Sequence, residues 1–172
     1  MLLEDIIALN KAVKLQPPYQ LTPFSPVHAQ MLDINHFDQV YFDTFSDYPG
    51  MLGHFSKLGN AYTGTWNGKP MCCFGGLPLW PGVAEFWMVP DRNLSSVARP
   101  FHRAAKLTLD IFMSEWRLFR LQVTVNSHNV AAVKWIKKMQ FIEEGRLAKY
   151  GPDGTDYFMF SRLEKPDERI MD

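Results

Sequence analysis

The segment after residue 89 combines residue types that bind anions. A strand-like run ends there, a polar loop follows, and a helix is predicted to open at Pro100. The first turn of a helix exposes backbone N–H groups without partners, and such groups bind phosphate or pyrophosphate. Hydroxyl donors and positive charges are added by Ser95, Ser96, Arg99 and Arg103. The segment therefore predicts either a phosphate-binding turn or an ordinary capped helix with solvated arginines.

Motifs of several other chemistries are absent. The sequence has no G-x-G-x-x-G, G-x-x-x-x-G-K-[ST] or G-x-S-x-G, which argues against a dinucleotide-binding fold, a P-loop NTPase and an α/β-hydrolase. The five histidines form no close ligand pair, so we expect no metal site. The two cysteines, Cys72 and Cys73, are adjacent, and we interpret them as packing residues of a strand and not as a disulfide or a nucleophile.

The composition is that of an ordinary globular domain. The chain has 172 residues, of which 47% are hydrophobic and 21% charged, and this length corresponds to about one domain. The 18 Lys+Arg residues balance 18 Asp+Glu residues, which argues against broad binding to a nucleic-acid backbone. No apolar run approaches the ~18 residues of a membrane span, and Glu4 and Asp5 stand where a signal peptide has cations. We therefore expect a cytoplasmic protein that binds neither nucleic acid nor membrane.

The first half of the chain predicts helices between short strands. Helical spacing over 1–15, ended by Pro17-Pro18, indicates a helical extension over residues 1–18. A strand over 19–24 and a Ser25-Pro26 helix start follow. One face of that helix carries Met31, Ile34, Phe37, Val40, Tyr41 and Phe45. After a break at Tyr48-Pro49-Gly50, a short helix is expected over 51–58, and then strands over 61–66 and 71–77 joined by an Asn67-Gly68 turn.

The second half predicts one crossover followed by antiparallel strands. The expected elements are a strand over 84–89, a helix over 100–117, a strand over 118–125, a helix over 130–139, and strands over 141–150 and 157–163. The strand–helix–strand unit across 84–125 should be right-handed with a locally parallel pair. We therefore predict an α/β domain over 19–164, in which a mixed, largely antiparallel sheet carries helices on both faces, followed by a charged tail over 165–172.

The stretch from Asn129 to Arg146 resembles the C-terminal signature of the GNAT (GCN5-related) N-acetyltransferase superfamily. It is closest to the amino-terminal-acetylating branch, whose pattern is N-x-x-S-x-x-v-x-e-k-x-G-F-x-x-E-G. The residues in register are Asn129, Ala132, Phe141, Glu144 and Gly145. The strand before this stretch and the strand after it also fit, and the element order agrees over roughly 19–164. The texture from Trp80 to Trp87 is also similar to GNAT-like proteins of tailed phages.

This resemblance implies a GNAT-like fold and acetyl-CoA as cosubstrate. The family's phosphate loop, Q/R-x-x-G-x-G/A, falls on Asn93-x-x-Ser96-x-Ala98, without either glycine. The residues implied for binding the cosubstrate are Met88, Val89, Ser95, Ser96, Val97, Ala98, Arg99, Arg103, Asn129 and Lys134, with Lys138 as a further candidate for the adenosine phosphate. The family's general-acid tyrosine falls at Ile136, which cannot donate a proton, and its glycine before Phe141 is Gln140.

Acyl transfer to an amine needs a group that accepts the amine's proton. Glu85 is the candidate base, because the family often places a carboxylate on this strand and because Phe86 and Trp87 could raise its pKa. With isoleucine at 136, Ser127 or His128 could protonate the leaving thiolate. The alternative interpretations are a surface glutamate at 85 and a histidine at 128 that only orders its loop.

The resemblance places the acceptor pocket at about 31–58 and 146–157. Both segments are rich in aromatic residues: Phe37, Tyr41, Phe42, Phe45, Tyr48, Tyr150 and Tyr157. These rings could form a cavity for an amine of a small molecule or a protein, or could simply pack the core. A second hypothesis is a catalytically inactive GNAT-fold binding or structural protein, for example a phage virion component that contacts other virion proteins. Exposed aromatics and the N-terminal helix would suit a homodimer.

Overall fold

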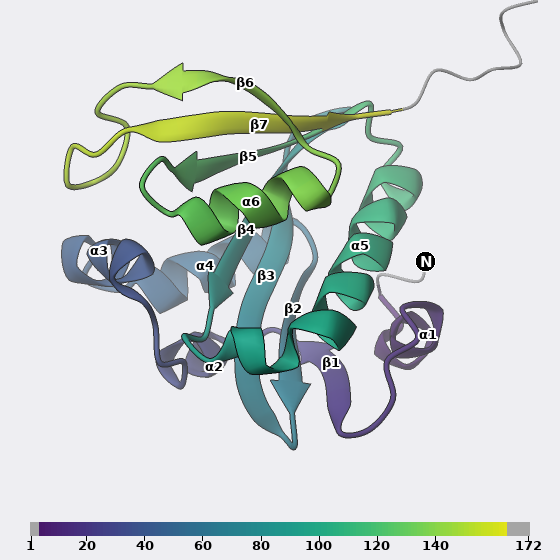
Figure 1. Ribbon diagram of the computed structural model, residues 1–172. Coiled ribbons are helices and arrows are strands. Elements are labelled where there is room, and N and C mark those ends of the chain that lie inside the picture. Colours follow the sequence, from purple (N-terminus) through teal and green to yellow (C-terminus); the bar gives the residue numbers. More distant parts are fainter. Residues whose placement is uncertain (1–3, 165–172) are drawn as a thin grey trace, which may run out of the picture.

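The computed structural model describes residues 4–164 (Figure 1). The elements follow one another along the chain in the order α1 (Ile6–Ala12), β1 (Tyr19–Pro23), α2 (Pro26–Gln30), α3 (His36–Thr44), α4 (Tyr48–Leu58), β2 (Ala61–Trp66), β3 (Lys69–Trp80), β4 (Val83–Pro90), the 3-10 helix η1 (Leu94–Val97), α5 (Ala98–Glu115), β5 (Arg120–Asn126), α6 (Val130–Lys138), β6 (Ile142–Leu147) and β7 (Tyr157–Leu163). The predicted tail over 165–172 lies outside the described residues.

The seven strands form one sheet with the order β1-β2-β3-β4-β5-β7-β6. Every neighbouring pair is antiparallel except β4 and β5, which are parallel. That parallel pairing is short, because it joins only Val83–Glu85 to Arg120–Gln122. Beyond this point β4 stays paired with β3, and β5 stays paired with β7, but β4 and β5 are no longer paired with each other. The sheet therefore has a gap in its middle, as Figure 1 shows.

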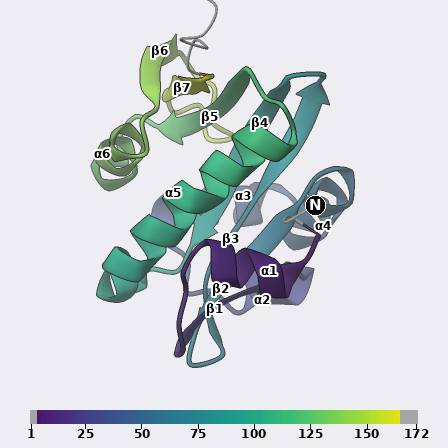
Figure 2. The same ribbon diagram turned by 90° about the vertical axis from the view of Figure 1, so that its right-hand side faces the viewer.

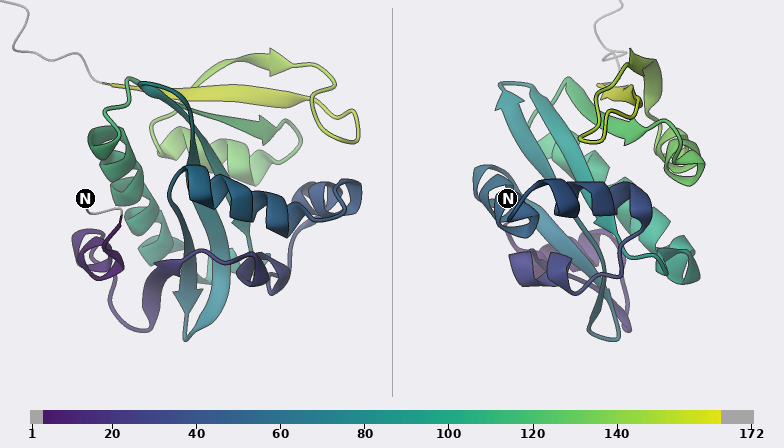
Figure 3. Two further views of the ribbon diagram at one scale, coloured as in Figure 1. Left: turned by 180° about the vertical axis from the view of Figure 1, so that it is seen from behind. Right: turned by 90° about the vertical axis from the view of Figure 1, so that its left-hand side faces the viewer.

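Helices cover both faces of the sheet, as the sequence predicted (Figures 2 and 3). On one face, α1, α5 and α6 pack over the larger core cluster. On the other face, α2, α3 and α4 cover a smaller cluster that includes Leu52 and Val89. Leu9 and Val13 of the N-terminal segment are fully buried in the larger cluster. The alternation of side chains along β3 sends Cys72 to one cluster and Cys73 to the other.

The prediction of one continuous helix after Ser25-Pro26 is wrong. The chain forms two helices, α2 and α3, separated by residues 31–35. The buried Asp91 carboxylate accepts the backbone N–H of Asp33 at 2.9 Å, which holds this link outside a helix. Asn35 then caps α3 by accepting the backbone N–H groups of Phe37 and Asp38. The long-range contact to Asp91 outweighs the helical spacing of the apolar residues.

The prediction of a break at Tyr48-Pro49-Gly50 is also wrong, because α4 begins there. Asp47 caps the helix by accepting the backbone N–H of Gly50 at 2.9 Å. Proline is well tolerated in the first turn, where its missing N–H group has no helical partner to lose. Elsewhere the structure adjusts lengths: β3 extends beyond 71–77, β6 is shorter than 141–150, and α5 begins two residues before Pro100.

Two turns have the backbone that the sequence indicated. Asn67 and Gly68 both have positive φ angles, 49° and 74°, as a tight hairpin between β2 and β3 requires. Gln140 has a φ of 68° at the position where the GNAT signature has glycine. This left-handed conformation explains why the family uses glycine there.

Candidate functional site

Two cavities meet at the gap between β4 and β5. We call them the acidic cavity, with a volume of about 510 Å³, and the basic slot, with a volume of about 570 Å³. The residues that line both are Met88, Pro90, Asn129, Ala132 and Trp135. Because these shared residues come from β4 and from the start of α6, the two cavities are contiguous at the place where the strands separate.

The basic slot lies between the start of α5 and α6. Its charged and ionisable side chains are all basic: Arg99, His102 and Lys138. Within residues 4–164, none of the three has a hydrogen-bonding or ion-pair partner. Phe101 and Trp135, stacked with ring centroids 5.8 Å apart, form an apolar part of its wall. The slot can therefore hold an anion that carries a long apolar or amide portion.

The loop that leads into α5 keeps its own polar groups occupied. Both the backbone N–H and the hydroxyl of Ser96 donate to the carbonyl oxygen of Asn93, at 3.0 and 2.7 Å. The backbone N–H of Ala98 donates to the carbonyl oxygen of Ser95, and Pro100 has no N–H group. A 3-10 turn at 94–97 thus takes the place of a glycine-rich loop with free amides.

Asp91 anchors this loop from inside the protein. Its carboxylate is 2% exposed and accepts the backbone N–H and side-chain amide of Asn93 at 2.8 and 3.1 Å. The pKa of Asp91 is lowered: burial raises it, but the hydrogen bonds from the Asn93 and Asp33 backbones and the Asn93 side chain outweigh that effect. The same carboxylate therefore fixes both the loop before α5 and the link before α3.

The residues predicted to bind the cosubstrate divide into two groups. Those that line the slot are Met88, Ser95, Ala98, Arg99 and Asn129, together with Lys138. Val89, Ser96, Val97, Arg103 and Lys134 do not line it. Val89 and Val97 are buried in the protein interior. The Arg103 guanidinium faces α1 and donates to the carbonyl oxygen of Lys14 at 2.8 Å.

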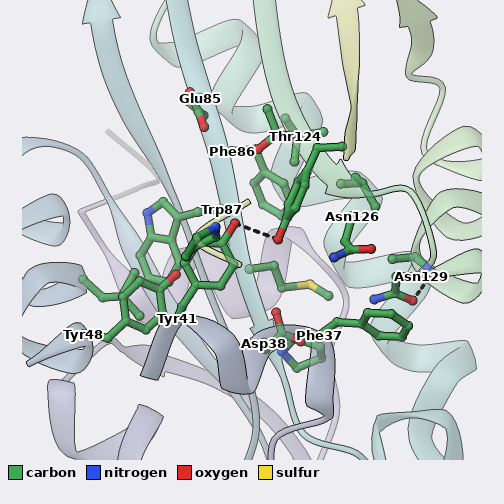
Figure 4. A pocket seen from close by; sticks show the side chains of 18 of the residues that line it. Phe37, Asp38, Tyr41, Tyr48, Glu85, Phe86, Trp87, Thr124, Asn126 and Asn129 are labelled. Atoms are coloured by element: carbon green, nitrogen blue, oxygen red, sulfur yellow. Dashed lines mark hydrogen bonds between the residues drawn. The ribbon is translucent and has the colours of Figure 1, made fainter. Parts of the chain in front are cut away.

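The acidic cavity is an aromatic chamber with two carboxylates (Figure 4). Its rings come from α3, α4, β4, α6 and the segment that leads into β7: Phe37, Tyr41, Phe45, Tyr48, Phe55, Phe86, Trp87, Trp135, Tyr150 and Tyr157. Its ionisable acids are Asp38 and Glu85, and no lysine, arginine or histidine lines it among the described residues. The acceptor region predicted at 31–58 and 146–157 therefore encloses a cavity and does not only pack the core.

Glu85 stands where β4 and β5 separate. It occupies the last paired position of the parallel register, opposite Gln122. Burial raises the pKa of Glu85, and a hydrogen bond from the Gln122 side chain partly opposes that shift. The candidate base thus lies on the cavity wall beside the gap, in surroundings that favour the uptake of a proton.

Asp38, which the sequence analysis did not single out, is the second carboxylate. It lies in the first turn of α3, and the side-chain amide of Asn35 donates to its Oδ2 at 2.7 Å. Burial raises the pKa of Asp38 to about 6, although the bond from Asn35 lowers it. The sequence signal was present as an acidic residue among the apolar face of α3, but the wrong helix boundary hid it.

Two tyrosines distant in sequence meet in the acidic cavity. The Tyr41 hydroxyl donates to the Tyr157 hydroxyl at 3.0 Å. Tyr41 also stacks on Tyr48 with centroids 5.3 Å apart. Burial raises the pKa of both Tyr41 and Tyr48, so these phenols stay protonated. Ile136, at the position of the family's tyrosine, lines the same cavity but is buried.

The two residues predicted as general acid lie outside both cavities. The backbone N–H of Ser127 donates to the carbonyl oxygen of Asp156 at 2.9 Å. His128 donates its backbone N–H to the Asn126 side chain at 2.9 Å. Both residues therefore order the β5–α6 turn, and the structure does not bring them to Glu85. Cys72 and Cys73 are fully buried and do not line the acidic cavity or the basic slot.

The described residues lack two further kinds of site. No group of three or more His, Cys, Asp or Glu side chains within 4–164 is placed to hold a metal ion. No helix in the same range is long and apolar enough to cross a membrane.

Comparison with solved structures shows a GNAT fold. An acetyltransferase of the GNAT family from Bacillus anthracis superposes with a TM-score of 0.65 at 15% identity, over 84% of this chain and 94% of that one. Ribosomal-protein-S5-alanine acetyltransferase from Vibrio fischeri gives 0.64 at 14%, over 88% and 96%. RimL, a ribosomal L7/L12 alpha-N-protein acetyltransferase in complex with coenzyme A, gives 0.62 at 12%, over 86% and 95%. No family model and no curated protein matches the sequence.

Proposed function

We propose that this chain is an N-acetyltransferase that moves an acetyl group from acetyl-CoA in the basic slot to an amine in the acidic cavity. The observation that carries the proposal is that two cavities of opposite charge meet at the gap between β4 and β5. A phosphorylated donor and a cationic acceptor would each enter the cavity of complementary charge. The GNAT fold, shared with a RimL structure in complex with coenzyme A, supports acetyl-CoA as the donor.

The basic slot fits a phosphorylated pantetheine through side chains. Phe101 and Trp135 offer apolar surface for the arm, and Arg99 and Lys138 offer charge for phosphate oxygens. The amides of Ser96 and Ala98, which the family's pattern would offer to a pyrophosphate, are hydrogen-bonded inside the loop. We therefore expect side-chain charge, more than the helix start, to hold the phosphates.

Glu85 acts as the base in this proposal. An aliphatic amine is protonated at neutral pH and must lose a proton before it can attack a thioester. Glu85 lies beside the gap, and its raised pKa suits a group that takes up that proton. Beyond Glu85 the register between β4 and β5 ends, so within residues 4–164 the backbone amides on that edge of β4 do not pair with β5, and they are our candidates to donate to the oxygen that becomes negative during attack.

The protonated amine loses two protons in the reaction. Glu85 takes the first before attack and later releases it to solvent, and the second leaves the nitrogen as it bonds to the acetyl carbon, while the thiolate that leaves takes one up. The hydrogen-bonded hydroxyls of Tyr41 and Tyr157 lie on the cavity wall and are our candidates for relaying this second proton from the nitrogen to the sulfur, since a hydroxyl that takes up one proton as it passes on another stays neutral. They would substitute for the tyrosine that the family has at the position of Ile136.

A specific observation also favours a second function, a GNAT-fold protein that binds without turnover. The loop before α5 lacks the glycines of the family, and the amides of Ser96 and Ala98 are hydrogen-bonded within it. In that case the basic slot would bind a phosphorylated ligand, and acetyl transfer would be absent for every amine.

Titration with acetyl-CoA, followed by an assay of acetyl transfer to an amine panel, separates the two functions. We expect saturable binding by calorimetry and thermal stabilisation, since a ligand at 100 times its Kd adds ~2.7 kcal/mol to the free energy of unfolding. We also expect transfer to at least one amine. Binding without transfer would favour the second function, and no stabilisation at roughly millimolar acetyl-CoA would overturn both.

A further inference from the structure

The acidic cavity holds two carboxylates that are separated from each other. Figure 4 shows Glu85 at one end of the labelled residues and Asp38 at the other, with Trp87 and Tyr41 between them. Glu85 belongs to β4 beside the gap, whereas Asp38 belongs to the first turn of α3. One carboxylate is enough for a base, so the second needs its own explanation.

Asp38 is not needed as a helix cap. Asn35 already caps α3, because its Oδ1 accepts the backbone N–H groups of Phe37 and Asp38 at 2.8 and 3.1 Å. The Asn35 side-chain amide then holds the Asp38 carboxylate against the cavity. Within residues 4–164, no lysine, arginine or histidine pairs with Asp38. A partly buried carboxylate without a counter-cation is unfavourable by itself, and a cation bound beside it would remove that penalty.

The wall between the two carboxylates suits the same kind of ligand. Tyr41, Tyr48 and Trp87 present aromatic rings to the cavity. Aromatic faces attract ammonium groups and also bury methylene chains. The Tyr48 phenol lies near enough to Asp38 for the carboxylate to contribute to the raised pKa of the phenol. An aromatic surface with a negative charge at each end is complementary to an alkyl chain with a positive charge at each end.

We infer that the acceptor is a linear di- or polyamine, with the amine that is acetylated beside Glu85 and a second ammonium group paired with Asp38. This inference rests on the proposed function for the acetylated end. In the reaction the first amine loses one proton to Glu85 and a second to the leaving thiolate as it gains the acetyl group, while the second ammonium group stays protonated and bound to Asp38. Asp38 is therefore a specificity-determining residue and not the base.

The test compares linear α,ω-diamines with n-alkylamines of matched length, in the wild type and in Asp38→Asn. Asparagine keeps the size of the side chain and its hydrogen bond to Asn35. We expect the wild type to prefer the diamine by about tenfold or more in kcat/KM, since one charge pair is worth about a factor of ten. Asp38→Asn should abolish this preference by raising the KM of the diamine about tenfold more than the KM of the monoamine of the same length.

Asp43→Asn is the matched control, because Asp43 lies on the same helix but is exposed and does not line the cavity. It should leave the preference intact. Equal use of both amines by the wild type, or an equal loss for both in Asp38→Asn, would overturn the inference. Calorimetry with the diamine alone separates this inference from the proposed function. If no amine is acetylated, diamine binding that Asp38→Asn weakens still supports the dication site, and absence of binding refutes it.

Discussion

The basic slot and the acidic cavity differ in how their charge is presented. In the slot, Arg99 and Lys138 are exposed side chains without partners in the described chain. In the cavity, Asp38 and Glu85 are partly buried, and each is held by an amide side chain, Asn35 or Gln122. Long flexible cations can adapt to phosphate groups in several positions. Fixed carboxylates in an aromatic wall select for the position of a cation. The basic slot is thus suited to recognise the charge of a ligand, and the acidic cavity is suited to recognise both the shape and the charge of a ligand.

The largest effect should come from removing the base on the cavity side. Glu85→Gln keeps the side-chain size but cannot accept a proton, and we expect kcat to fall by about 10²- to 10⁴-fold, the usual range for a general base. The Kd of acetyl-CoA should not change, because Glu85 does not line the basic slot. Steady-state kinetics and calorimetry measure the two quantities.

Glu143→Gln provides the control for this substitution. Glu143 is exposed and forms a salt bridge with Lys137 outside both cavities, so activity should stay at the wild-type level. An unchanged kcat in Glu85→Gln across pH would exclude Glu85 from the mechanism and remove the functional contrast between the two regions.

The next effect concerns stability and its dependence on pH. The folded-state pKa of Asp38 is raised from 3.8 to about 6, so between these values the folded chain holds a proton that the unfolded chain has released. Asp38 therefore lowers the free energy of unfolding as the pH rises through this window, by up to about 3 kcal/mol. Asp38→Asn should be more stable than the wild type at pH 7.5 and equally stable near pH 4.

Urea unfolding of both proteins at the two pH values measures this difference. Comparing variant with wild type isolates Asp38, since the other carboxylates titrate alike in both. If the variant and the wild type were equally stable at pH 7.5, the charged Asp38 would carry no desolvation penalty. That result would argue against a cation-binding role for the acidic cavity. Addition of a diamine should reduce the difference in the free energy of unfolding between the variant and the wild type, because a bound cation stabilises the charged carboxylate.

The smallest effect should come from the slot. Arg99→Ala and Lys138→Ala should each raise the Kd of acetyl-CoA by about tenfold at low salt, with less effect at high salt, since exposed charges are screened. Amine binding should not change. Lys134→Ala is the control, because Lys134 lies on α6 but does not line the slot. Equal losses in all three variants would indicate a general effect of net charge and not a built phosphate site.

Sequence patterns predicted most of the sheet, because alternation and turn residues are local signals, and the resemblance of residues 129–146 to the GNAT signature predicted the GNAT fold. The Asn67-Gly68 hairpin and the β4–α5–β5 crossover are examples. The α2–α3 link could not be predicted, since it depends on a carboxylate 58 residues away in the chain. The hydrogen bonding of the loop before α5 could not be predicted either. A serine hydroxyl can bond to many partners, and the sequence does not show that Ser96 donates to the carbonyl oxygen of Asn93.

The site was predictable only where one element determines it. Glu85 was predicted because the GNAT family often places a carboxylate on this strand, and it lines the acidic cavity, while its role as the base stays a prediction. Tyr41 and Tyr157 meet across 116 residues, so no spacing rule could pair them. The place of Asp38 in the cavity depends on where α3 begins. Because the predicted helix began at Pro26, Asp38 was not recognised as a site residue. His128 and Ser127 were chosen by proximity to a helix start, whereas in the structure the backbone N–H of Ser127 donates to Asp156 and that of His128 donates to the Asn126 side chain.

The neighbouring cysteines of β3 give the molecule a natural reporter of its own opening. Cys72 and Cys73 are each 0% exposed and face opposite layers, and burial raises the pKa of the Cys73 thiol to about 12. Alkylation requires a thiolate that the reagent can reach. Labelling of Cys72 therefore records loosening beneath α5, and labelling of Cys73 records loosening beneath α2 and α4. Mass spectrometry of the singly labelled species would show which layer separates from the sheet first.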